Sequence, residues 1–276
     1  MKRLITADSS ANIYASERAD FTSVPLKIVA GDKEYTDDEQ LDVSAMLREL
    51  QAYNGHSGTA CPSVSDWLNA FGDAEEIFGV ALTSRLSGCY SASQIAANEY
   101  ITEHPERKVF ILDSLSAGPE PELIIEKYSE LICSNKTFEA ICDEIKQYLE
   151  HTRLAFSLES LLNFAKNGRV NPVLAKAIGF LGIRIVGRAI TEGDLEPQHK
   201  CRGENTALQK LLHTMLDEGF SGGKVRIRHS ENPEAAEKLA MNIKSIYPSA
   251  DIKIGQNHGL CSYYAEKGGV LVGYEV

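Results

Sequence analysis

Apolar runs and amphipathic segments follow one another along the first half of the chain. The runs at residues 77–83 and 108–113 predict buried strands, because apolar side chains continue through them without alternation. A polar loop and then a segment with helical spacing follow each run, at 90–101 and at 122–133. Strand, loop and helix in this order are typical of a parallel sheet covered by helices. Further strands are expected at 3–6 and 25–30, and further helices at 44–53 and 138–150.

The second half of the chain has a different pattern, with charged residues interleaved among shorter apolar runs. It predicts strands at 153–157, 182–190, 224–229, 251–254 and 270–274, and helices at 158–166, 172–180, 206–218, 233–246 and 261–266. The change of pattern places a domain boundary near residue 155, which divides the chain into 1–154 and 155–276. Both parts have the length of an ordinary domain. We therefore expect two α/β domains, the first built on a parallel sheet.

Charge and cysteine usage exclude several classes of protein. The formal net charge of −11 over 276 residues argues against a nucleic-acid grip, because phosphate backbones bind basic surfaces. The N-terminus lacks the apolar stretch of a signal peptide, and no window of about 18 apolar residues predicts a membrane span. Six cysteines occur without CxxC or zinc-finger spacing. We expect free thiols in a reduced, cytoplasmic protein.

Polar loops follow three of the predicted strands, at residues 8–10, 83–88 and 113–116. In parallel sheets, ligands bind beyond the carboxyl ends of the strands. The loop 83–88 also precedes a helix, whose free amides and positive dipole end attract anions. An ordinary helix cap explains the same residues. The chain has no P-loop, dinucleotide fingerprint, G-x-S-x-G elbow or H-E-x-x-H motif, so the common enzymes that use them lose support.

Three basic positions and one histidine are candidate binding residues in this acidic chain. Arg169 lies in a turn between two predicted helices, and its planar guanidinium suits a carboxylate or a phosphate. Lys200 and Arg202 form a small basic island that is a candidate docking surface. His258 follows a predicted strand, where it reaches a site or makes a structural hydrogen bond. A solvated surface position explains Arg169, Lys200 and Arg202 as well.

Several short motifs occur in a fixed order along nearly the whole chain. They are residues 7–10 (ADSS), 25–26 (PL) with 35–37 (YTD), 59–63 (TACPS), 83–90 (TSRLSGCY), 113–114 (DS), 158–170 (LES to GRV), 200–203 (KCRG) and 258–259 (HG). Each motif is degenerate by itself, but their order and approximate spacing are specific. In this order they resemble the DegV family, bacterial fatty-acid-binding proteins that serve as the binding subunit of fatty acid kinase.

The resemblance implies two α/β domains with a long-chain fatty acid buried in the cleft between them. The family's carboxylate hydroxyls correspond to Thr59 and Ser87. The full set carried over for the carboxylate is Thr59, Ser84, Ser87, Gly88 and His258. The set carried over for partner docking or headgroup exit is Arg169, Lys200 and Arg202.

The same resemblance implies a non-catalytic chain that presents its ligand to a separate kinase subunit. That subunit carries ATP and magnesium and makes acyl phosphate, so no cofactor or metal is expected in this chain. The chemistry is consistent with this division of labour. A carboxylate buried with an apolar tail needs hydrogen-bond donors, and two hydroxyls beside a helix N-terminus supply them without a permanent ion pair.

Three cysteines lie in or beside the motif segments, at Cys61, Cys89 and Cys261. Replacement of residues of similar volume explains them, and a thiol-sensitive pocket is the alternative. A second possible function is a hydrolase or transferase with Ser87 or Cys89 as the nucleophile and His258 as the base. A third is a regulatory protein that binds a partner through its basic island.

Overall fold

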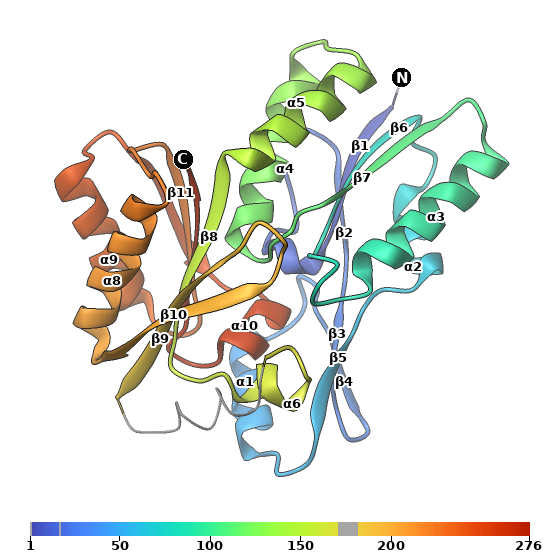
Figure 1. Ribbon diagram of the computed structural model, residues 1–276. Helices are drawn as coiled ribbons and strands as arrows, with labels where there is room; N and C mark the ends of the chain where they lie inside the picture. The colour runs from blue at the N-terminus through green and yellow to red at the C-terminus, as the bar shows by residue number, and fades with distance from the viewer. Residues whose placement is uncertain (1, 17, 171–181) are drawn as a thin grey trace.

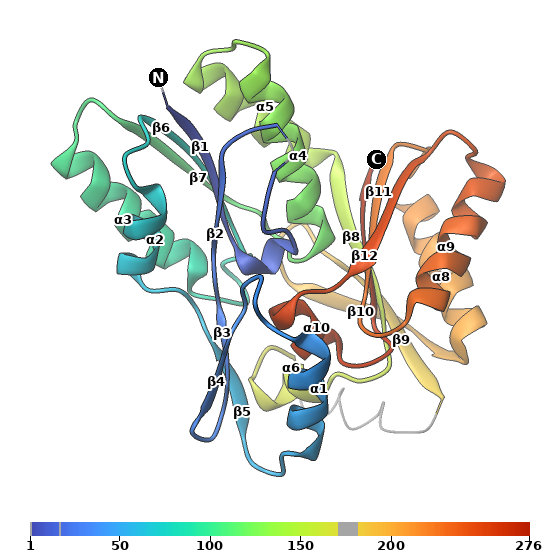
Figure 2. The same ribbon diagram turned by 180° about the vertical axis from the view of Figure 1, so that it is seen from behind.

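The computed structural model describes residues 2–16, 18–170 and 182–276. The helix expected at 172–180 lies outside these residues. Within them the chain forms three sheets, called A, B and C below, with helices packed around them (Figures 1 and 2). The α/β fold expected from the sequence is confirmed.

Sheet A is the parallel sheet predicted for the first half of the chain. Its strand order is β2–β1–β6–β7, and all of its neighbours run parallel. The strands are β1 (Arg3–Asp8), β2 (Phe21–Val24), β6 (Glu76–Ala81) and β7 (Lys108–Asp113). Strand β1 runs two residues past its predicted end, and β2 was not predicted because its residues, FTSV, mix polar and apolar types.

Helices cover both faces of sheet A. The helices α2 (Val64–Phe71) and α3 (Cys89–Glu103) pack on one face, and α4 (Pro119–Cys133) and α5 (Phe138–Glu150) pack on the other (Figure 1). A capping box of Ser63 and Asp66 starts α2. Helix α4 starts three residues earlier than expected, because Pro119 is well suited to a first helical position.

Sheet B is a small antiparallel sheet below sheet A in Figure 1. It consists of β3 (Lys27–Ala30), β4 (Lys33–Thr36) and β5 (Ser57–Ala60), in the order β4–β3–β5. The predicted strand at 25–30 is therefore real from residue 27, but it does not join the parallel sheet. Helices α1 (Val43–Ala52) and α10 (Gly259–Ala265) pack against sheet B, so the last quarter of the chain contacts its first quarter.

Sheet C has six strands in the order β10–β9–β8–β13–β11–β12. They are β8 (Thr152–Leu158), β9 (Ile183–Ala189), β10 (Leu195–Arg202), β11 (Lys224–His229), β12 (Asp251–Gln256) and β13 (Val270–Glu275). Only β11 and β12 pair in parallel. Helices α8 (Glu204–Asp217) and α9 (Pro233–Ile246) pack on one face of this sheet.

Two elements of this region depart from the sequence-based expectation. The helix expected at 158–166 begins only at Leu162, as α6 (Leu162–Lys166), because β8 continues to Leu158. Strand β10 was not predicted, since its polar residues follow no strict alternation and a bulge interrupts it between Pro197 and His199. The division of the chain into domains stays a prediction, and the position chosen for it, after residue 154, falls inside β8.

Helix α4 lies between sheets A and C. Its apolar residues join the core under sheet A, while its first residues press against β13. Gly273 of β13 permits this, because a Cβ at that position would clash with the Pro119 carbonyl group. Helix and strand therefore meet backbone to backbone, which fixes their separation.

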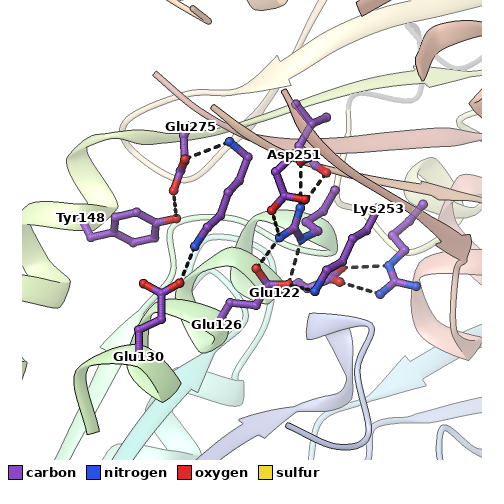
Figure 3. A network of polar contacts seen from close by, with 11 residues as sticks. Glu122, Glu126, Glu130, Tyr148, Asp251, Lys253 and Glu275 are labelled. Atoms are coloured by element: carbon purple, nitrogen blue, oxygen red, sulfur yellow. Dashed lines mark hydrogen bonds and ion pairs between the residues drawn. The ribbon is translucent and has the colours of Figure 1, made fainter. Parts of the chain in front are cut away.

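A ladder of ion pairs, called the charged seam below, runs along the same contact (Figure 3). Glu122, Glu126 and Glu130 of α4 face Arg228, Arg226 and Lys224 of β11. The two arginines bind their glutamates with two hydrogen bonds each, of 2.6–2.9 Å. Arg226 is 1% exposed and also donates to Asp251 at 3.0 Å. The seam therefore joins α4 to sheet C through charge, whereas the core joins α4 to sheet A through apolar contact.

Candidate functional site: an apolar cavity with a polar mouth

A cavity of about 300 Å³ lies among sheet B, sheet C and the loops that leave sheet A. Its wall is mostly apolar. Leu154, Phe156 and Leu158 come from β8, Leu271 from β13, and Leu86 from the loop after β6. Such a wall attracts an apolar ligand, because burial removes the apolar surface of both from water.

Polar groups gather in one part of this wall, and four of the predicted residues are among them. Thr59, Ser87, Gly88 and Arg169 all line the cavity. Thr59 lies in β5 of sheet B, Ser87 and Gly88 lie at the start of α3, and Arg169 lies in the turn after α6. The fold therefore brings together residues that are more than 100 positions apart in the chain.

Tyr264 is a cavity residue that the sequence analysis missed. Its hydroxyl lies 2.8 Å from Thr59 Oγ1, and its ring packs against Phe164 of α6 at 4.7 Å. A tyrosine in a short helix after HG carries no motif of its own, so no feature of the sequence pointed to it. The pair offers two hydroxyls that either donate or accept hydrogen bonds.

Ser87 lies at the N-terminus of α3. Its hydroxyl donates to Cys89 Sγ at 3.1 Å and accepts the Cys89 amide hydrogen at 3.3 Å. The first amides of a helix lack acceptors within the helix, and the helix dipole adds positive potential there. Ser87 and Gly88 thus present polar groups to the cavity at a place that favours a negative charge.

Arg169 marks the opening of the cavity. Its Nε donates to the Leu86 carbonyl at 3.2 Å, and its Nη1 donates to the Asn167 carbonyl. The same side chain lines a polar surface hollow of about 560 Å³, which also includes Ser84 and Ser91. Cavity and hollow share Leu86, Ser87, Gly88 and Arg169. The polar part of the cavity wall therefore faces the surface, and the apolar part lies deeper.

Besides His258, the structure places three predicted residues away from the cavity wall. Ser84 lies in the outer hollow, and its amide donates to Asp113. Lys200 and Arg202 are exposed on β10. They pair with Ile185 and Ile183 of β9, so they share the cavity-facing side of sheet C. The cavity residue Leu195 begins this strand, and Arg202 ends it, about 23 Å away at 3.3 Å per residue.

His258 lies outside the residues that line the cavity, so its expected place beside the carboxylate is not supported. Its ring stacks on Tyr14 with centroids 3.9 Å apart, and its amide donates to Asn12 Oδ1 at 2.8 Å. Burial, with a smaller contribution from Arg228, lowers the pKa of His258 to about 4. The imidazole is therefore neutral at physiological pH and offers no positive charge to an anion.

Two buried aspartates explain why the motif residues form this arrangement. Asp37 accepts hydrogen bonds from the amides of Gly259 and Leu260 at 2.6 and 3.0 Å, which fixes the start of α10. Asp8 accepts from the Leu82 amide at 2.6 Å and links β1 to the loop after β6. Burial raises the pKa of Asp37 to about 6 and raises that of Asp8 as well.

The three motif cysteines have different surroundings. Cys61 and Cys261 both line the cavity, but Cys61 is exposed, whereas Cys261 and Cys89 are buried. Burial raises the pKa of Cys89 and Cys261, so both are protonated thiols at neutral pH. Only Cys61 combines access to solvent with contact to the cavity.

Within residues 2–16, 18–170 and 182–276, no group of three or more His, Cys, Asp or Glu side chains has the arrangement of a metal site. None of the helices in that same part of the chain is long and apolar enough to span a membrane.

Comparison with known proteins agrees with the geometry. The family model of DegV matches residues 2–275. The chain belongs to the DegV family. A DegV domain-containing protein of Streptococcus pneumoniae is 40% identical over 256 residues, which cover 93% of this chain and 91% of that protein. A DegV domain-containing protein of Streptococcus pyogenes is 37% identical and covers 99% of both chains.

Two solved structures of DegV proteins are similar over their full length. A DegV family protein from Eubacterium eligens, loaded with heptadecanoic acid, has a TM-score of 0.97 and 43% identity, with 99% of each chain covered. The fatty acid kinase (Fak) B3 protein of S. pneumoniae, loaded with linoleic acid, has a TM-score of 0.98 and 38% identity, with all of each chain covered. The resemblance inferred from the motifs is thereby confirmed.

Proposed function

We propose that this DegV protein binds a long-chain fatty acid and presents its carboxylate to a separate ATP-dependent kinase subunit, which forms the acyl phosphate. The observation that carries the proposal is the polarity of the cavity, apolar in its depth and lined with hydroxyls and an arginine at its mouth. An acyl chain fits the first part, and a carboxylate fits the second. The fatty acids held by two similar structures support the same assignment.

The proposed arrangement assigns a role to each group at the mouth. Thr59 and Ser87 donate their hydroxyl hydrogens to the carboxylate, and Thr59 exchanges its contact with Tyr264 for one with the ligand. The N-terminus of α3 stabilises the negative charge. Arg169 lies where the carboxylate meets the surface, so a partner that approaches through the outer hollow reaches the reacting oxygen. The chain itself supplies the substrate and is non-catalytic in this scheme.

Lys200 and Arg202 are proposed to form an outlying part of the docking surface. They lie at the far end of β10 from the mouth, so one partner contacts both places only if its surface spans about 23 Å. Replacement of Arg202 by glutamate should weaken the complex with the kinase and leave lipid binding intact. If wild type and Arg202→Glu bind the kinase equally well, Arg202 is not part of the interface. This division of labour is expected in the cytoplasm, where ATP is available.

The central experiment is identification of the ligand. The purified protein is extracted with organic solvent and the extract is analysed by mass spectrometry, before and after incubation with palmitate or oleate. We expect one acyl chain per protein molecule. Absence of any acyl chain, together with no uptake of either fatty acid, would refute the binding function. Acyl phosphate formation is then assayed with the kinase subunit and ATP.

A hydrolase with Ser87 or Cys89 as the nucleophile is the second candidate. It needs a base, and His258 was the residue expected to serve. His258 instead stacks on Tyr14, and the Ser87 hydroxyl is paired with Cys89. This arrangement disfavours the hydrolase. Turnover of p-nitrophenyl esters that disappears in Ser87→Ala would restore it.

A further inference from the structure

The turn between β9 and β10 crosses from sheet C to the loops of sheet A beside the cavity mouth. In Figure 1 this hairpin reaches toward the ends of β6 and β7. Strand β8 pairs with β9 only as far as Arg188, whereas β9 and β10 pair with each other as far as Ala189 and Leu195, so the end of the hairpin extends beyond β8. We call residues 190–194 the hairpin tip. Two hydrogen bonds within the tip close its turn, from the Gly193 amide to the Ile190 carbonyl at 2.8 Å and from the Ile190 amide to the Asp194 carbonyl at 2.9 Å.

Two contacts attach the hairpin tip to the loop after β6. The hydroxyl of Thr83, a fully buried residue, donates to the Gly193 carbonyl at 2.9 Å. Arg85 forms an ion pair with Asp194, with Nε and Nη2 at 3.1 and 3.0 Å from the same carboxylate oxygen. The first contact is buried and the second is about half exposed.

The attachment depends on a close approach that glycine alone permits. Gly193 has a φ of +87°, which side chains rarely adopt, and a Cβ there would clash with Thr83 Oγ1. The same Cβ would lie 3.3 Å from the Leu115 backbone in the loop after β7. The hairpin tip thus sits directly on two loops at the carboxyl edge of sheet A.

Both ends of the attachment lead into the cavity wall. Leu86 follows Arg85 by one residue, and Leu195 follows Asp194 by one residue; both leucines line the cavity. Arg85 and Asp194 also line the outer hollow with Arg169. Separation of the tip from the loop would therefore part Leu86 from Leu195 at the place where the cavity meets the surface.

The hairpin also has a bend behind the tip. The bulge between Pro197 and His199 interrupts the β9–β10 pairing, and Pro197 pairs with Gly187. Bulges bend a strand and interrupt its ladder of hydrogen bonds. A tip that is held by few contacts and carried on a bent arm moves more readily than either sheet.

We propose that the hairpin tip is a clasp on the acyl cavity, and that opening of the Thr83–Gly193 and Arg85–Asp194 contacts controls the rate at which fatty acids enter and leave. This inference rests on the proposed binding function. A clasp makes no contact with the ligand in this scheme. Weakening it should therefore speed loading and release by the same factor and leave the equilibrium affinity unchanged.

The test is a stopped-flow measurement with cis-parinaric acid, a fluorescent polyunsaturated fatty acid. Loading is followed after mixing with delipidated protein, and release after mixing the complex with excess oleate. We expect Gly193→Ala to accelerate both rates about tenfold. Asp194→Asn should accelerate both about two- to fivefold, because a half-exposed ion pair contributes modestly. High sodium chloride should speed release from the wild-type protein and have little effect on Asp194→Asn.

Gly219→Ala is the matched control. Gly219 also has a left-handed φ of +102°, but it lies in the turn between α8 and β11, where a Cβ would meet only Val276 at 3.6 Å. It should share the backbone strain of Gly193→Ala and none of its effect on rates. Should Gly193→Ala fail to fold, the exposed Asp194→Asn and Arg85→Gln test the same contact.

The outcomes separate the clasp from the binding function. Absence of parinaric acid binding to the wild-type protein would refute the proposed function. Normal binding with rates in Gly193→Ala and Asp194→Asn equal to those of wild type would refute the clasp. Faster release without faster loading would also refute it, because that result marks a damaged ligand site.

Discussion

The apolar cavity and the charged seam both lie against sheet C, and opposite kinds of side chain form them. The cavity wall is apolar and encloses about 300 Å³ of space. The charged seam is filled with ion pairs, and its central residue, Arg226, is almost fully buried. The two regions share α4, which begins beside the cavity residue Ala117 and continues along the seam.

The difference indicates that separate regions of the molecule determine its stability and its affinity for a ligand. Burial of charge costs free energy that only well-placed partners recover, so the seam tolerates little change in geometry. An apolar wall has no such demand and accepts ligands of varied shape. Stability of the contact between α4 and sheet C should therefore depend on the seam, and ligand affinity on the cavity.

Removal of the central guanidinium should have the largest effect. Arg226→Met removes the hydrogen bonds of a buried guanidinium to Glu126 and Asp251 but leaves Glu126 paired with Lys253. We expect a loss of about 3 kcal/mol of unfolding free energy, at the low end for a broken buried pair, because both carboxylates keep access to water. Urea denaturation measures it. Lys108→Met breaks an exposed pair with Glu139 and should cost less than about 1 kcal/mol. Similar losses of unfolding free energy in both variants would show that the seam contributes no more to stability than an exposed ion pair.

Removal of the ligand tests the other region. Delipidated protein should be less stable than protein with fatty acid at about 100 times its Kd, by about 2.7 kcal/mol, because the ligand binds only the folded state. Denaturation with and without oleate gives the difference. Arg226→Met should gain the same increment from oleate as the wild-type protein, and a much smaller gain would show that seam and cavity are coupled.

A single hydroxyl at the mouth should contribute less. Thr59→Val preserves shape but removes a donor to the carboxylate, and a hydrogen bond to a charged group contributes about 1.5–3 kcal/mol. Affinity for oleate should fall about tenfold or more, with little change in stability. Methyl oleate, which has no carboxylate, should bind wild type and variant alike. A large loss for the ester too would show that the variant distorts the cavity.

The glutamates of α4 offer a comparison by pH. Glu120 is buried with the Thr152 hydroxyl, and burial raises its pKa to about 7, whereas Glu122 two residues on is bound by Arg228. A carboxyl with a folded-state pKa above its unfolded value stabilises at low pH and loses that contribution as pH rises through about 7. Glu120→Gln should reduce the fall in stability between pH 5 and 8, by at most about 1.4 kcal/mol per unit. An unchanged slope would contradict this assignment.

The smallest effect concerns the exposed thiols. Iodoacetamide should alkylate Cys61 and Cys133, which are exposed, and spare the buried cysteines. Bound fatty acid should slow the labelling of Cys61, which lines the cavity, and leave Cys133 unchanged. Peptide mass spectrometry reports both rates in one sample. Equal labelling of Cys61 with and without ligand would place its sulfur away from the acyl chain.

Much of sheet A could be predicted from sequence because its central strands, β1 and β6, are buried on both faces and are therefore rich in apolar residues. The same reasoning missed β2 and β10, since edge strands keep polar residues that carry no such signal. The sequence pattern also does not indicate which strands pair with each other. The strand at Lys27–Ala30 was therefore predicted, but its place in sheet B was not.

The site shows the same limit. Motif order brought Thr59, Ser87 and Arg169 to attention, and the fold places all three on one cavity. It gave no distances, so His258 was grouped with them although its ring stacks elsewhere. Tyr264 went unnoticed because its part depends on a contact with Thr59, which only the folded chain makes.

The charged seam has a further consequence that follows from its spacing. Residues four apart on a helix are about 6 Å apart along its axis, and residues two apart on a strand are about 6.6 Å apart. The three glutamates of α4 therefore have nearly the same spacing as the three cations of β11, and each glutamate faces one cation. A slide by one rung would leave an unpaired charge at each end. The seam thus fixes the register of α4 along β11.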